Sequence, residues 1–84
     1  MKPVFITNHA RLQMKERGIL ETEIMETLNS GDISTAKKGR WCYRANFVYQ
    51  SHWQGKFYRT KQVKAIVAEE DSERVIVTAI SLYF

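Results

Sequence analysis

The feature that most constrains this chain is a change in the spacing of its apolar residues near residue 31. Residues 8–30 carry apolar side chains at helical spacing, whereas from Ile33 onward apolar and polar residues alternate, and β-branched and aromatic residues dominate. The chain has 84 residues, enough for one small domain, and its 44% apolar content can supply one core. These features predict an α+β fold with two N-terminal helices packed on an antiparallel sheet of about four strands.

The helical half is expected to divide at Gly18. Residues 8–17 contain no Gly or Pro, Thr7 or Asn8 can cap their start, and Gly18 suits the position after the last helical residue. A second helix is expected over residues 21–29, with Ser30-Gly31 as its stop. The short link between the two predicts an angled helix pair.

The first helix carries a polar stripe beside its apolar side. Ala10 and Met14 lie one turn apart and are expected to face the core, while His9, Gln13 and Arg17 follow each other at intervals of four residues. A neutral imidazole can transfer protons near neutral pH, and a guanidinium can bind phosphate. Two helical turns separate His9 from Arg17 by about 12 Å, which suits neighbouring phosphates better than one. The alternative is a partly exposed His9 packed at a helix end.

The second half is expected to form the sheet. Residues 51–55 resemble a hairpin loop, and the strand that begins near Phe57 either continues or restarts at Val63. Residues 70–73 form an acidic turn, and residues 74–83 form a last strand that is apolar on both faces and therefore expected to be central. Alternation predicts a core face on the first long strand, made of Trp41, Tyr43, Ala45, Phe47 and Tyr49.

Charge is unevenly distributed along the chain. The net charge is +4, but residues 1–30 sum to 0, residues 31–68 to +7 and residues 69–84 to −3, and seven of the ten aromatic residues fall in the basic segment. Cations neutralise phosphates and aromatic rings stack on unpaired bases, so this segment favours an RNA partner. The alternative is that the aromatic rings are core and the charges keep strand edges soluble. The candidate RNA-binding residues are Lys37, Lys38, Arg40, Arg44, Lys56, Arg59, Lys61 and Lys64.

Several classes of function lack support in the sequence. No P-loop, dinucleotide-binding glycine motif or His-Glu-x-x-His occurs, and Cys42 with two His is too little for a structural zinc site. We therefore expect no metal and no cofactor. A lone cysteine and the absence of a long apolar run predict a cytoplasmic protein that is not embedded in a membrane.

Thr78 interrupts an otherwise apolar strand. It could fill the core as a β-favouring residue, or it could hold a phosphate from an open face, and Lys64 poses the same question. The residues alone leave both alternatives open.

The opening helix carries a recognisable motif, His9-Ala10-x-x-x-Met14-x-x-Arg17-Gly18-Ile19, and the chain closes on a Val77-Thr78 strand. This pattern resembles a bacterial domain-of-unknown-function family that opens on His-Ala-x-x-Arg-Met-x-x-Arg-Gly-Ile. That family is similar to the RelE-like and barnase-like ribonuclease folds, which include BrnT-type toxins. The resemblance covers nearly the whole chain and implies a single domain of this type over residues 1–84.

The resemblance implies a small metal-independent endoribonuclease of toxin type that acts on RNA and is held by an antitoxin or immunity protein. The RNA 2′-hydroxyl would be the nucleophile; His9 would transfer protons, Arg17 with Arg44 or Lys64 would stabilise charge, and Thr78 would bond phosphate. Gln13 stands where the family usually has Arg, which removes a fixed positive charge from the stripe. That substitution favours the alternative, a non-catalytic module on the same fold that binds RNA or a protein.

Overall fold

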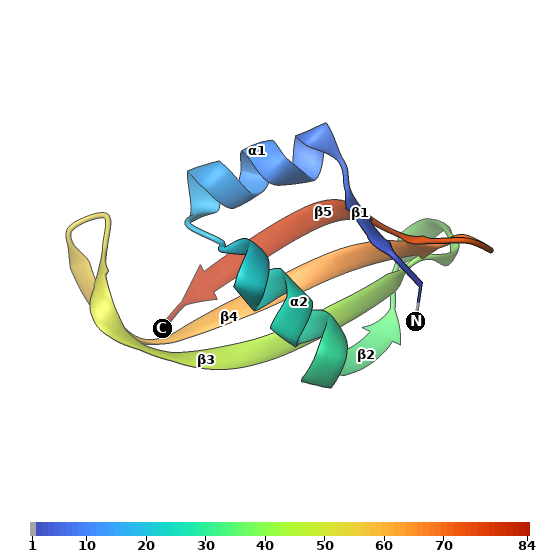
Figure 1. Ribbon diagram of the computed structural model, residues 1–84. Coiled ribbons are helices and arrows are strands. Elements are labelled where there is room, and N and C mark those ends of the chain that lie inside the picture. The colour runs from blue at the N-terminus through green and yellow to red at the C-terminus, as the bar shows by residue number, and fades with distance from the viewer. Residues whose placement is uncertain (1) are drawn as a thin grey trace.

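The computed structural model describes residues 2–84 and has two helices on one face of a mixed sheet (Figure 1). The strands lie in the order β1-β5-β4-β3-β2, with β1 parallel to β5 and all other neighbours antiparallel. The elements in chain order are β1 (Val4–Ile6), α1 (Asn8–Arg17), α2 (Glu21–Ser30), β2 (Asp32–Thr35), a 3₁₀ turn η1 (Lys37–Gly39), β3 (Trp41–Trp53), β4 (Lys56–Glu69) and β5 (Arg74–Tyr83).

The α+β class is confirmed, whereas the prediction of four antiparallel strands is wrong. The sheet has five strands, because the short N-terminal segment 4–6 joins β5 in parallel and residues 32–35 form a strand of their own. The predicted loop 51–55 is also wrong at its start. Strand β3 continues to Trp53, and the turn consists of Gln54 and Gly55, both with positive φ.

Both helices begin and end close to where the sequence places them. The Thr7 hydroxyl accepts a hydrogen bond from the Ala10 amide at 3.1 Å, and Gly18 closes α1 with φ 68°, a left-handed conformation that glycine adopts without strain. The Glu23 carboxylate accepts a bond from the Leu20 amide at 2.9 Å and so caps α2.

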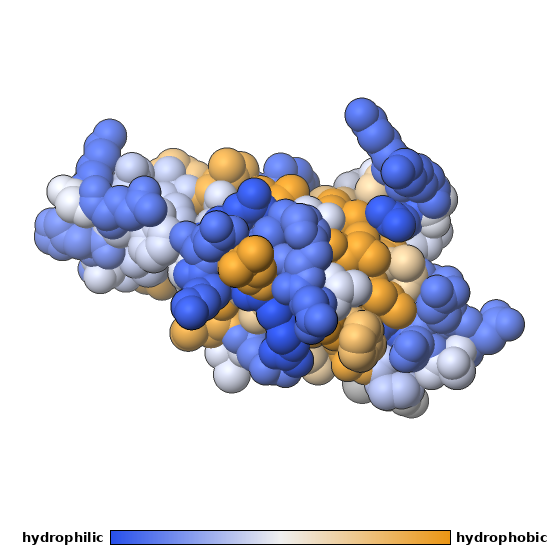
Figure 2. Space-filling view, turned by 90° about the horizontal axis from the view of Figure 1, so that it is seen from above, coloured by the Kyte–Doolittle hydropathy of each residue, from blue (hydrophilic) through white to orange (hydrophobic). Residues whose placement is uncertain are grey.

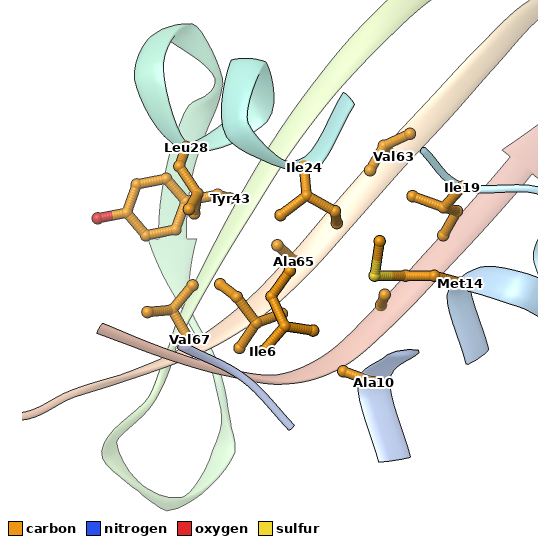
Figure 3. Close-up of a cluster of buried hydrophobic side chains, with 12 residues drawn as sticks. Ile6, Ala10, Met14, Ile19, Ile24, Leu28, Tyr43, Val63, Ala65 and Val67 are labelled. Carbon is orange, nitrogen blue, oxygen red and sulfur yellow. The ribbon is translucent and has the colours of Figure 1, made fainter. Parts of the chain in front are cut away.

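The core lies between the helices and one face of the sheet (Figure 3). Ala10 and Met14 reach it from α1, Ile24 and Leu28 from α2, as the helical spacing predicted. The sheet contributes side chains that alternate along its strands, namely Tyr43, Val63, Ala65, Val67, Ile76 and Ala79.

Because both helices lie on one face, the other face of the sheet carries no helix or strand among residues 2–84 (Figure 1). Strand β5 is therefore not buried on both faces as expected. It lies second from the edge of the sheet, and Val75, Thr78 and Ile80 are half-buried on the uncovered face. The apolar residues on both faces of β5 predicted a strand covered on both sides, but the same pattern also occurs in a strand with one face exposed to solvent.

Candidate functional site

The uncovered face of the sheet brings two cations together. Tyr43 and Ala65 are partners in the register and point into the core, so their neighbours Arg44 and Lys64, which are also partners, point to the uncovered face. Directly opposite residues on one face have their Cβ atoms about 5 Å apart. The two charges can therefore bind a single phosphate or two adjacent ones.

Polar groups extend this pair along the same two strands. Asn46 and Gln62 are the next partners on the uncovered face, and the Gln62 amide Nε2 donates to Asn46 Oδ1 at 2.9 Å. These two amides are candidate binding groups that were not predicted from the sequence. Alternation already placed Asn46 on the same side as Arg44, so the signal was available in the pattern.

Thr78 lies on this face too. It is the register partner of Ile66, whereas Lys64 is the partner of Ile80, so Thr78 and Lys64 are diagonal neighbours on adjacent strands. Such neighbours lie about 7–8 Å apart, within reach of a long side chain. Arg44, Lys64 and Thr78 thus form one group, which we call the basic row.

Strand β2 adds an acid beside the basic row. Asp32 is the register partner of Arg44 and is exposed, so a carboxylate, a guanidinium and an ammonium follow each other across β2, β3 and β4. The net charge of these three side chains remains positive. Asp32 therefore does not neutralise the basic row.

The polar stripe of α1 has a different surrounding. Gln13 Oε1 accepts a hydrogen bond from the Ala79 amide at 2.9 Å, and the Arg17 guanidinium donates to the Ala79 carbonyl at 2.6 Å. Ser81 and Tyr83 hydroxyls donate to the Arg17 carbonyl at 3.0 and 2.7 Å. The stripe thus binds the backbone of β5 at Ala79, beyond the residues that pair with β1. The Arg17 guanidinium stabilises the contact between α1 and β5.

His9 is not brought together with the other predicted catalytic residues. Its side chain is exposed in the first turn of α1, in the helical layer, whereas Thr78 points to the opposite face of the sheet. Within residues 2–84 no hydrogen bond joins His9 to Arg17 or Thr78. The three residues therefore occupy three separate surroundings.

Lys61 also differs from its expected role. Its side chain is 3% exposed, forms an ion pair with Glu23 at 2.7 Å and donates to the Gly18 carbonyl. The ammonium lies over the rings of Tyr49 and Tyr83, 5.8 Å from each centroid. Its charge holds α2 and the turn before it to β4.

The other predicted RNA-binding residues lie at the two ends of a molecule 41 Å long. Lys37 and Lys38 are exposed in η1, next to Arg40, at one end. Lys56 and Arg59 lie on the β3–β4 hairpin at the other end, and Lys56 covers the Tyr58 ring at 5.6 Å. The basic segment is therefore one stretch of sequence but several separate surfaces.

Most aromatic rings of the hairpin pack on each other. Trp53 stacks on Tyr83 with centroids 5.0 Å apart, and Tyr49 and Tyr58 contact the same Tyr83 ring. A Cβ at Gly18 would approach the Trp53 ring within 2.6 Å, so the hairpin is packed tightly against the end of α1. These rings are half-buried against each other and lie outside the core. Phe57 differs, because it is 51% exposed and contacts His52 edge-on. Of the rings expected on the core face of β3, Tyr43 is buried and Trp41 is 40% exposed.

A groove of about 650 Å³ lies on the helical side between α2 and β1. Figure 2 shows apolar side chains among hydrophilic ones on this side, and Val4, Met25 and Leu28 line the groove. On its rim Arg74 and Lys2 both bind Glu69, at 2.9 and 3.1 Å. The groove contains none of the predicted site residues.

Among residues 2–84 no group of three or more His, Cys, Asp or Glu side chains is arranged to hold a metal ion. In the same part of the chain, no helix has the length and apolar character needed to cross a bilayer.

One family model matches the chain over residues 6–81, and its description is domain of unknown function DUF4258. No curated protein and no solved structure matches the chain. The match extends from β1 into β5 and therefore covers both the basic row and the polar stripe of α1.

Proposed function

We propose that this protein, which belongs to the DUF4258 family, binds RNA through the basic row on the uncovered face of its sheet. The observation that carries the proposal is the pairing of Arg44 with Lys64 on adjacent strands, with the Thr78 hydroxyl diagonal to Lys64 on the next strand. Two cations and a hydroxyl on a flat, accessible surface suit the phosphates of a nucleic-acid backbone.

The surroundings of the row support this proposal. The amides of Asn46 and Gln62 follow it along the strands and can donate or accept hydrogen bonds from bases or ribose. The absence of an internal partner for either cation also matters. Within residues 2–84, neither Arg44 nor Lys64 forms an ion pair, whereas Lys61 on the opposite face does.

The test is the salt dependence of binding to a labelled single-stranded RNA, measured by fluorescence anisotropy for the wild type and for Lys64→Gln and Arg44→Gln. Each phosphate contact releases counterions, so removing one cation should lower the slope of log affinity against log salt by about 0.7–1. Lys15→Gln is the matched control. It removes the same charge from the exposed side of α1 and should leave the slope unchanged.

Equal losses in Lys15→Gln and Lys64→Gln would mean that net charge attracts RNA and that the basic row is not the site. Wild-type protein that shows no RNA binding even at low salt would refute the proposal.

A metal-independent endoribonuclease of toxin type, held by an antitoxin or immunity protein, is our second proposal. The position of Thr78 favours it, because a hydroxyl beside Lys64 can help to hold a phosphate while an adjacent 2′-hydroxyl attacks it and the 5′-oxygen of the next nucleotide leaves. The resemblance to RelE-like and barnase-like ribonucleases implies proton transfer by His9, but His9 lies in the helical layer and Thr78 on the opposite face of the sheet, so the two residues do not act on the same phosphate. Arg17 serves by positioning β5 through Ala79.

Cleavage of total RNA in the presence of a chelator tests the second proposal, with His9→Ala and Thr78→Val as variants. Loss of cleavage in Thr78→Val with cleavage retained in His9→Ala would support a site at the basic row, and the reverse result would support a site at His9. Unchanged cleavage in His9→Ala would remove His9 from the mechanism, and binding without any cleavage by the wild type would leave the RNA-binding module as the function.

A further inference from the structure

The two outer edges of the sheet differ in how their backbone groups are covered. On the β5 side, β1 pairs with residues 74–76, and Gln13 and Arg17 of α1 then bind the amide and carbonyl of Ala79. On the β3 side, β2 pairs with residues 41–44 of a strand that continues to Trp53. Strand β3 therefore has a free edge beyond Arg44.

This free edge lacks two of the features that normally protect an exposed strand. Residues 45–49, Ala-Asn-Phe-Val-Tyr, contain no charge and no proline. No backbone hydrogen bond from another element among residues 2–84 reaches their outer side. Val48 is 86% exposed. Uncharged, β-favouring edges of this kind pair readily with another strand.

Both ends of the free edge are well defined. At one end Asp32 of β2 occupies the edge beside Arg44. At the other, the register shifts between Val48 and Ser51, and Gln50 has φ 43°, so a bulge bends the strand away. Five residues are thus left to accept a partner strand.

Space for a partner exists beside the edge. A hollow of about 390 Å³ lies between the last turn of α2 and β3. Its lining includes Glu26, Ser30, Ala45 and Phe47. Side chains of an added strand that point toward the helices would enter this hollow.

We propose that a second copy of this chain occupies the free edge, its β3 antiparallel to the first about a two-fold axis at Phe47. This register places Ala45 opposite the partner's Tyr49 and Asn46 opposite the partner's Val48. The paired run consists of residues 45–49 of both copies. It is bounded by β2 beside Arg44 at one end and by the bulge after Val48 at the other.

Three properties favour a second copy as the occupant. In this register the side chains on each face match, since Ala45, Phe47 and Tyr49 share the helical face and Asn46 and Val48 share the uncovered face. No charged residues meet within the paired run. A second copy also offers an uncharged strand with a free edge, because its residues 45–49 are such a strand.

The two-fold axis is perpendicular to the sheet, so the uncovered faces of both copies lie on the same side. Two basic rows would then lie on one continuous sheet of ten strands. Self-association does not depend on RNA binding, and it can be measured without RNA.

The first test is sedimentation velocity on nuclease-treated protein over a range of concentrations. We expect a concentration-dependent dimer in the wild type and a dissociation constant raised at least about tenfold in Val48→Lys, because a lysine on an edge strand opposes pairing. Leu82→Lys is the control, since it places the same charge on the uncovered face of β5, away from the free edge. A monomeric wild type, or equal weakening in both variants, would overturn the proposal.

The second test is disulfide crosslinking in a Cys42→Ser background. Opposite residues of an antiparallel pair have Cα atoms about 4.5–5.5 Å apart, which is within disulfide range. Asn46→Cys mixed with Val48→Cys should therefore form a crosslinked dimer far more than either variant alone. Equal crosslinking of the single variants and the mixture would exclude the register at Phe47.

Discussion

Lys61 and Lys64 lie three residues apart on β4 and have opposite surroundings. The Lys61 ammonium is buried against Glu23 and the rings of Tyr49 and Tyr83, whereas Lys64 lies on the uncovered face beside Arg44. Burying an ammonium is costly unless its partners replace water. Lys61 is thus committed to the fold, and Lys64 is available to an external anion.

This difference predicts opposite effects for the same substitution. Lys61→Met leaves the Glu23 carboxylate without its partner and should lower the free energy of unfolding by about 2–4 kcal/mol. Lys64→Met should change it by less than about 0.5 kcal/mol while weakening RNA binding. Urea unfolding and RNA anisotropy on both variants provide the comparison. Equal stability of the two variants would show that the Lys61 pair contributes little.

Sequence alternation contained part of this distinction. Lys61 has the same parity as Val63, Ala65 and Val67, which are all core residues, so its direction was predictable. Its partner was not, because Glu23 belongs to a helix 38 residues away along the chain. The sum of charges over residues 31–68 included Lys61 as if it were exposed, because such a sum does not depend on whether a side chain is buried.

At the scale of elements, α1 covers the edge of the sheet as well as its face. Strand β1 has three residues and β5 has ten, so most of the outer edge of β5 lacks a strand partner. Gln13 and Arg17 replace that partner at Ala79. The stripe that the sequence suggests as an active site is a seam between a helix and a strand.

Substitutions at Gln13 should therefore affect stability through their ability to accept a hydrogen bond. Gln13→Arg restores the residue type usual at this position in the family that the opening motif resembles, but it has no acceptor and leaves the Ala79 amide unpaired. We expect a loss of about 1–3 kcal/mol in the free energy of unfolding. Gln13→Glu keeps an acceptor and should lose less. A Gln13→Arg variant as stable as the wild type would contradict this role.

Hydrogen exchange of the Ala79 amide gives a direct readout of the same seam. Exchange at Ala79 should be faster in Gln13→Ala than in the wild type, while amides of β4 remain protected.

The bounds of α1, which carries this stripe, were predictable from Thr7 and Gly18, because caps are local signals. The β5 edge that the stripe binds was not predictable, since the pairing of β1 with β5 became known only with the sheet.

At the scale of the whole molecule, the charge segments of the chain separate into surfaces with different roles. Four acids lie at residues 69–73, at the end of β4 and in the turn after it, and Glu69 binds both Lys2 and Arg74. The Arg74 guanidinium also donates to the Tyr43 hydroxyl at 2.5 Å and lies over the ring. This network joins the start of the chain to β3, β4 and β5.

The network should make stability depend on acid pH through Glu69. The hydrogen bond from Arg74, aided by Lys2, lowers the pKa of Glu69 below its ordinary value. The stabilisation is therefore present above the unfolded pKa and is lost as pH falls through the folded pKa. Glu69→Gln should cost about 0.5–1 kcal/mol at neutral pH and nothing at strongly acid pH, by urea unfolding.

Glu70→Gln is the matched control. The substitution removes the same charge from the neighbouring position, and the Glu70 side chain forms no ion pair with Lys2 or Arg74. A pH-independent difference between Glu69→Gln and the wild type would assign the effect to packing and not to ionisation.

The sequence by itself determined the two helices, the long strands, the alternating core face and the presence of a segment with net charge +7. These depend on spacing and caps, which act over a few residues. The tertiary structure decided which face stays uncovered, that Arg44, Lys64 and Thr78 meet there, and that Arg17 and Lys61 serve the fold. Such outcomes depend on contacts between segments distant in the chain, because a side chain is free or engaged according to what packs against it.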